Sequence, residues 1–145
     1  MIENFINKKE IYAIIIRRNY KSKGIEFFTP NNFSQQLGYM SHNLGHIILP
    51  HLHNSVRREV KLTNEVLFIK KGKVRIDFYD KNQKYLESSI LNQGDVILLS
   101  SGGHGFEMLE KTEMIEVKQG PYVGNRDKTR FNPVSLNKIK FKKND

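Results

Sequence analysis

Apolar and polar residues alternate over short runs along most of the chain, and clusters of Gly, Asn, Asp and Lys separate these runs. Alternation with a period of two is typical of half-buried β-strands. No stretch shows the longer period of an amphipathic helix, so crossover helices between parallel strands are not expected. The pattern therefore predicts an all-β chain folded as an antiparallel sandwich or barrel.

The clearest pair of strands lies in EVLFIKKGKVRIDFYD, residues 65–80. Lys71 and Gly72 can supply the positive backbone angles of a tight turn, so we predict a β-hairpin here. The first ten residues are expected to form a short helix or an arm. Two further hairpins are predicted, which pair 11–17 with 24–29 and 35–42 with 45–52.

One domain is expected from the length of 145 residues, which is enough to bury a core without disulfides. We place it at residues 1–131 and predict a basic tail or an edge strand at 132–145. The apolar run IYAIII is too short to cross a bilayer and ends at Arg17, so no membrane partner is expected. The chain lacks cysteine, which fits a cytoplasmic protein and excludes thiolate metal ligands.

The net charge of +9 raises the question of a nucleic-acid partner. Residues 125–145 hold seven Lys and Arg against two Asp, so a net +5 lies in this stretch, with Phe131 and Phe141 as its aromatic side chains. Charge concentrated in a tail is typical of a solvated segment, whereas a nucleic-acid interface needs a patterned basic face. The distribution therefore argues against a nucleic-acid partner.

Histidines supply the first candidate chemistry, in the segment GHIILPHLHNSV. In a strand His51 and His53 point to the same side, which brings two imidazoles together. On a following strand Glu65 shares a face with Leu67 and Ile69, and a carboxylate on such an apolar wall needs a partner or a metal. Glu59 is the alternative carboxylate, since it lies nearer to His53 in the sequence.

A third imidazole follows a pair of glycines in SSGGHGF, where Gly102 and Gly103 allow a sharp turn before His104. Three imidazoles and one carboxylate suit one divalent metal ion such as Fe, Mn, Ni, Co or Zn, and leave coordination positions open. The candidate metal ligands are His51, His53, Glu65 and His104.

These residues fall in an order that resembles the two motifs of the cupin superfamily. The first motif is matched by Gly45, His51, His53, Glu65 and Gly72, and the second by Gly94, Asp95 and His104. The resemblance covers roughly residues 35–118. It implies a single cupin-type double-stranded β-helix, an antiparallel jelly-roll barrel, with the metal inside the barrel and with a homodimer as the expected assembly.

The function expected from this resemblance is a metal-dependent enzyme, an isomerase or an oxygenase, acting on a small polar molecule of the sugar or carboxylate type. Two alternatives stay open: a non-catalytic cupin that binds a small ligand such as a sugar, and a metal-free sugar-nucleotide isomerase or epimerase in which His and Tyr transfer protons. Arg58 and Tyr122 are the candidate substrate-binding residues, because Arg58 can clamp an anion and Tyr122 lies in a loop that can act as a lid.

Overall fold

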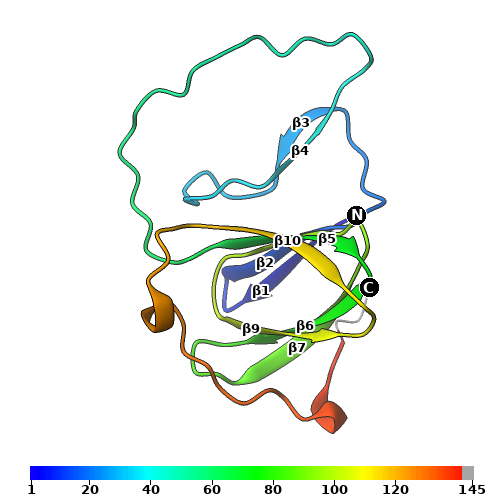
Figure 1. Ribbon diagram of the computed structural model, residues 1–145, viewed down its shortest axis with the longest axis vertical. Helices are drawn as coiled ribbons and strands as arrows, with labels where there is room; N and C mark the ends of the chain where they lie inside the picture. Colours follow the sequence, from blue (N-terminus) through cyan, green and yellow to red (C-terminus); the bar gives the residue numbers. More distant parts are fainter. Residues whose placement is uncertain (142–145) are drawn as a thin grey trace.

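The computed structural model describes residues 1–141, and of Asn125 the backbone alone. Within these residues the chain is all-β, as predicted, with antiparallel pairing in every sheet (Figure 1). Two short 3-10 helices lie near the C-terminal end. The elements are β1 (Ile2–Asn7), β2 (Glu10–Ile16), β3 (Gly24–Phe27), β4 (Gly38–Ser41), β5 (Glu65–Lys71), β6 (Lys73–Tyr79), β7 (Tyr85–Asn92), β8 (Val96–Leu99), β9 (Gly103–Met108), β10 (Glu113–Lys118), η1 (Gly124–Arg126) and η2 (Leu136–Lys138).

Two sheets make the body of the fold. One has five strands in the order β1-β2-β8-β5-β10, and the other has three in the order β7-β6-β9. In residues 1–141 no strand pair joins these sheets, so the sandwich is open on the side where β9 and β10 form the sheet edges. The jelly-roll barrel stays a prediction, since a closed barrel would need that side to be filled.

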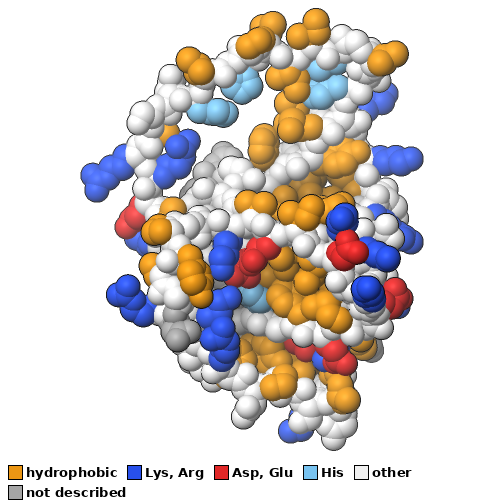
Figure 2. Space-filling model, in the orientation of Figure 1, with side chains coloured by type: hydrophobic (Ala, Val, Ile, Leu, Met, Phe, Trp, Pro, Cys, Tyr) orange, Lys and Arg blue, Asp and Glu red, His pale blue; other side chains and the backbone are white. Residues whose placement is uncertain are grey.

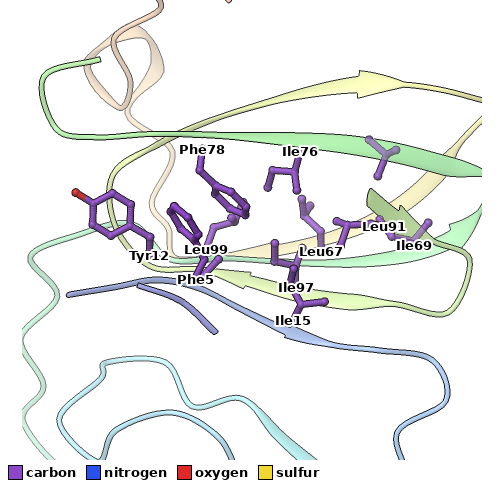
Figure 3. Packing of buried hydrophobic residues seen from close by; sticks show 12 residues of the cluster. Phe5, Tyr12, Ile15, Leu67, Ile69, Ile76, Phe78, Leu91, Ile97 and Leu99 are labelled. Carbon is purple, nitrogen blue, oxygen red and sulfur yellow. The ribbon is translucent and has the colours of Figure 1, made fainter. Parts of the chain in front are cut away.

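The main core lies between the two sheets, and Figure 3 shows its side chains pointing toward one another from both layers. Alternate residues of β5, β6 and β8 enter it, as the period of two predicts. Phe5 of β1 stacks on Phe78 of β6 with ring centroids 4.2 Å apart. Each fully buried aliphatic or aromatic side chain of this kind stabilises the fold by about 1.5–3 kcal/mol. The buried members are Phe5, Tyr12, Ala13, Ile15, Leu67, Ile69, Val74, Ile76, Phe78, Leu91, Ile97 and Leu99.

A second core covers the outer face of the five-stranded sheet. Ile14 and Ile16 of β2 and Leu98 of β8 pack there against Leu37, which precedes β4. Strand β2 is therefore buried on both faces, which explains why its sequence is a continuous apolar run rather than an alternating one.

Gly72 joins two strands that lie in different sheets, so the predicted hairpin over residues 65–80 is wrong in its pairing. The strands themselves are where the alternation places them, but β5 pairs with β8 and β10, and β6 pairs with β7 and β9. Gly72 has φ +84°, and a Cβ there would lie 2.4 Å from the carbonyl oxygen of Lys111. Glycine is thus required at the corner where the chain crosses between the layers.

The other two predicted hairpins are also wrong in their partners. Strand β2 pairs with β1 and β8, while β3 pairs with β4, and residues 45–52 form no strand. The first ten residues are not a helix or an arm but contain β1, the edge strand of the large sheet. Lys8 and Lys9, with φ +48° and +68°, form the two-residue turn that joins β1 to β2.

Asp95 follows Gly94 in the turn before β8 and is fixed by its neighbours. Its carboxylate accepts hydrogen bonds from the Arg17 guanidinium at 2.9 Å, the Arg18 backbone N–H at 2.8 Å and the Asn92 backbone N–H at 2.9 Å. The residue is 1% exposed. In this structure the Gly-Asp pair of the second motif therefore holds the turn between β7 and β8.

The C-terminal stretch packs on the small sheet as far as the structure describes it. The Tyr79 hydroxyl accepts a hydrogen bond from the Val134 N–H at 3.0 Å, and the Ser88 N–H donates to the Lys140 carbonyl at 2.7 Å. Phe141 forms an isolated parallel bridge with Ser88. The tail or edge strand expected at 132–145 is thus held against β7 up to residue 141, and its last four residues lie outside the described part.

Candidate functional site

Glu65 and His104 meet on the inner side of the sandwich. Glu65 begins β5 and His104 is the second residue of β9, and His104 Nε2 lies 3.0 Å from Glu65 Oε2. The side chains are 12% and 27% exposed. Glu65 shares its face with the buried Leu67 and Ile69, as the alternation predicts. A carboxylate and an imidazole from two sheets thus form one hydrogen-bonded pair.

Electrostatics keep this carboxylate ionised. The hydrogen bond from His104 holds the pKa of Glu65 below its ordinary value, although burial acts in the opposite direction. Positive charge on Lys128 and Lys118 lowers this pKa further. An ionised carboxylate can only accept hydrogen bonds, so Nε2 of His104 carries the hydrogen and Nδ1 is the basic nitrogen of the neutral ring.

The turn before β9 positions the imidazole. Gly102 has φ +69°, and a Cβ on it would lie 2.3 Å from the ring of Tyr12 and 2.7 Å from the carbonyl oxygen of Tyr79. This glycine allows the sharp turn that the sequence predicts beside His104. The imidazole is thereby placed over the end of the main core.

The pair lies in a cavity of about 870 Å³ at the open side of the sandwich. Phe106, which packs against the main core, gives the cavity an apolar part. Its polar part holds both signs of charge, with Lys128 and Arg130 from the segment after β10 and Glu116 from β10 itself. A cavity of this size, lined by one apolar wall and many charged or polar side chains, suits a small polar ligand.

Strand β10 contributes charged side chains near the pair that were not predicted from the sequence. Met114 packs against the core, so Glu116, two residues on, lies on the inner face of this strand, as does Lys118 after it. Lys118 Nζ lies 3.8 Å from Asp127 Oδ2 and 5.6 Å from the centroid of the Tyr122 ring. The alternation of Met114 with two charged residues was the signal that could have identified them.

His51 and His53 lie outside this cavity. They belong to residues 42–63, which form no strand, and both are exposed. Their ring centroids are 5.2 Å apart, and Nδ1 of His51 bonds the Leu49 carbonyl at 2.9 Å. The strand predicted at 45–52 would be needed to bring these imidazoles to the sheet.

The predicted ligands therefore lie in two separate pairs, His51 with His53 and Glu65 with His104. Among residues 1–141 no group of three or more His, Asp or Glu side chains is placed to hold a metal ion. The residues as positioned do not form the four-ligand site.

The other candidate residues are more exposed. Arg58 is exposed on the same strandless segment, and Tyr122 is 74% exposed with Lys118 near its ring. Glu59 pairs with Lys61 at 3.4 Å and lines a different cavity of about 710 Å³. Of the two carboxylates considered from the sequence, Glu65 is the one that contacts His104.

Comparisons of the chain with models of protein families, with curated proteins and with solved structures find no match. None of the helices within the described residues has the length and apolar character needed to cross a membrane.

Proposed function

We propose that this protein is an enzyme that transfers protons on a small anionic molecule bound in the cavity of Glu65 and His104, on a fold of the cupin type. The observation that carries the proposal is the 3.0 Å hydrogen bond between the two side chains at the wall of that cavity. A carboxylate that fixes the tautomer of an imidazole leaves its other nitrogen to accept or donate a proton. His104 is the proposed acid and base, and Glu65 orients it.

Positive charge beside the pair favours an anionic substrate. Lys128 and Arg130 line the cavity, and Lys118 is close enough to lower the pKa of Glu65. Asp127 offsets part of this charge, since it lies 3.8 Å from Lys118. A carboxylate or phosphate group can bind to the remaining cations, which places the carbon skeleton of the substrate over His104. This agrees with the sugar or carboxylate type of substrate expected from the sequence.

Proton exchange with solvent gives a direct test. The protein is incubated in D₂O with a panel of carboxylate-bearing and phosphate-bearing hydroxy compounds, and loss of C–H signals is followed by NMR. We expect exchange on at least one compound. It should fall about 100-fold or more in His104→Gln, the order of magnitude typical for loss of a general acid or base, and by a smaller factor in Glu65→Gln, which loses the orienting carboxylate. The matched control Glu59→Gln should exchange at the wild-type rate.

Two results of this experiment would contradict the proposal. Exchange that persists in His104→Gln would exclude this imidazole as the acid and base. Binding of panel compounds without any exchange would favour the non-catalytic cupin that binds a small ligand.

A second candidate is the metal-dependent cupin enzyme. It is favoured because two of the four predicted ligands, Glu65 and His104, contact each other. The other two, His51 and His53, lie close to each other on a segment without strands. Elemental analysis of tag-free protein, together with His51→Ala and His104→Ala, separates the candidates. A metal-dependent enzyme loses stoichiometric metal in both variants, whereas in the metal-free enzyme His51→Ala leaves proton exchange unchanged.

A further inference from the structure

We propose that a second cavity, next to the one that holds Glu65 and His104, binds an uncharged sugar unit of the substrate. The inference deepens the proposed function and rests on it in one respect, that the anionic end of the same molecule lies beside His104. The second cavity, which we call the side cavity, measures about 710 Å³. Four residues line both cavities: Lys61, Leu62, Ser100 and Ser101. One ligand can therefore extend from one cavity into the other.

The side cavity lies at one end of the five-stranded sheet. Its wall is made by the turn into β2, the connection between β3 and β4, the chain before β5 and the chain after β8. In Figure 1 the β3–β4 connection and the chain that enters β5 both lie at the left of the view. Asn64 Nδ2 donates to Ser34 Oγ at 3.2 Å, and the Ser100 hydroxyl donates to the Ile11 carbonyl at 2.7 Å. These bonds hold the segments together, so the cavity is formed before a ligand binds.

The lining of the side cavity offers neutral hydrogen-bonding groups. Asn32, Ser34 and Asn64 bring amide and hydroxyl groups, which can both donate and accept. Among its described lining residues two lysines stand against two glutamates, so the cavity has no excess of either charge. Glu59 and Lys61 pair with each other at 3.4 Å, and both side chains are 76% exposed to solvent. The side cavity therefore suits an uncharged polar ligand.

Glu10 provides a fixed acceptor in this cavity. Lys81 Nζ lies 2.8 Å from Glu10 Oε2, and the Ser101 hydroxyl donates to Glu10 Oε1 at 2.7 Å. The hydrogen bond from Lys81 holds the pKa of Glu10 below its ordinary value, so the carboxylate is ionised. An ionised carboxylate only accepts hydrogen bonds and keeps lone pairs for further donors. Hydroxyl groups of a sugar are such donors, and bonds to a charged acceptor are the stronger ones.

Phe33 gives the side cavity an aromatic wall. The ring packs against the second core and stays half-buried, and Pro30 lies beside it in the lining. A sugar ring has apolar C–H groups on its faces and hydroxyl groups at its edge. It can therefore pack on Phe33 while its hydroxyls bond to Glu10 and Asn32.

Net positive charge lies on the other side of the shared residues. Figure 2 shows Lys and Arg side chains gathered with acidic side chains and a histidine around an apolar hollow between β9 and β10. Lys128 and Arg130 line the Glu65–His104 cavity but not the side cavity. A molecule with an acidic group at one end and a neutral sugar at the other end matches both cavities. The substrate class is therefore an acidic glycoside of at least two units.

Binding of neutral glycosides tests the side cavity without any reaction. Saturation-transfer NMR is recorded with the uncharged methyl glycosides of glucose, galactose, mannose and N-acetylglucosamine. We expect at least one to bind, with its affinity weakened about fivefold in Glu10→Gln and in Asn32→Ala, each of which loses a hydrogen bond. Glu113→Gln is the matched control and should bind as the wild type does. Glu113 also pairs with a lysine, Lys70 at 3.2 Å, and is similarly exposed, but it lines neither cavity.

A disaccharide that joins a uronic acid to the preferred neutral sugar tests whether one ligand fills both cavities. It should bind about tenfold more tightly than the methyl glycoside of the same uronic acid, because the second contact is intramolecular. The gain should disappear in Glu10→Gln.

Three results would overturn the inference: no neutral glycoside binds, the affinity is the same in the wild type and Glu10→Gln, or the disaccharide binds no more tightly than its uronic acid. Failure of the proposed function looks different. Proton exchange would then be absent with every compound, while the neutral glycoside and the disaccharide still bind the wild type more tightly than Glu10→Gln.

Discussion

Glu65 and His104 lie 39 residues apart in the chain, and the 3.0 Å contact between their side chains joins the five-stranded sheet to the three-stranded sheet. The pair therefore combines two roles, since the same hydrogen bond that orients the imidazole also links the layers next to the open side. Changes to Glu65 should alter stability as well as the proposed proton transfer.

Glu65→Gln should reduce the free energy of unfolding by about 1–2 kcal/mol near pH 7, because the variant loses a charge-assisted hydrogen bond. The folded-state pKa of Glu65 is lowered from 4.5, so the wild type has its full advantage above that value and loses it as pH falls through the folded pKa. Urea unfolding of both proteins at several pH values measures this. A difference that does not shrink in acid would show that the ionised carboxylate is not its source.

Gly102→Ala should destabilise the fold by about 2 kcal/mol or more, because the new Cβ would meet the Tyr12 ring and the Tyr79 carbonyl in a backbone conformation that L residues rarely adopt. Gly105→Ala is the matched control, since its Cβ finds its nearest atom at 3.8 Å. Thermal unfolding of the two variants compares them. Similar melting temperatures would contradict the tight turn before His104.

Asp95→Asn should cost about 3 kcal/mol, because the buried carboxylate accepts three hydrogen bonds, one of them from the Arg17 guanidinium. Asp80→Asn serves as the control in a turn nearer to solvent, where Asp80 accepts from the N–H groups of Asn82 and Lys84 and the loss should stay below about 1 kcal/mol. Chemical denaturation gives both values. Equal losses would mean that burial of Asp95 does not matter.

Removal of residues 132–145 should lower stability by about 2 kcal/mol, because Tyr79 loses its bond from Val134 and Ser88 loses its bond to Lys140. A shorter deletion of residues 142–145 keeps these bonds and serves as the control. Urea unfolding measures the free energy of unfolding of both variants. If the two deletions lower it by the same amount, residues 132–141 do not stabilise the small sheet.

Strand positions could be predicted from the sequence because alternation records which side chains are buried. Residues 65–71 and 73–79 are strands as predicted, and Glu65 lies on the inner face with Leu67. Pairing could not be predicted, because Gly72 permits a corner between sheets as readily as a hairpin turn. Local periodicity carries no information about which strand lies next to which.

The candidate site was predicted in part for the same reason. Glu65 lies on a strand whose face the sequence reveals, His104 follows the turn predicted at Gly102 and Gly103, and the structure brings the two together. Bringing His51 and His53 to the same place needs a long-range pairing that no local pattern specifies. Lys118 was not predicted to lie near Glu65, because a charged residue on an edge strand is normally solvated.

The turn between β1 and β2 offers a route to a more robust protein. Lys8 and Lys9 both have positive φ, a conformation that Asn-Gly adopts with much less strain, and they set two like charges side by side. Replacing them with Asn-Gly should raise the free energy of unfolding by about 1 kcal/mol. The gain would come at the tip of an edge hairpin that lines no part of the Glu65–His104 cavity. Thermostability could therefore be engineered there without any change to the residues of that cavity.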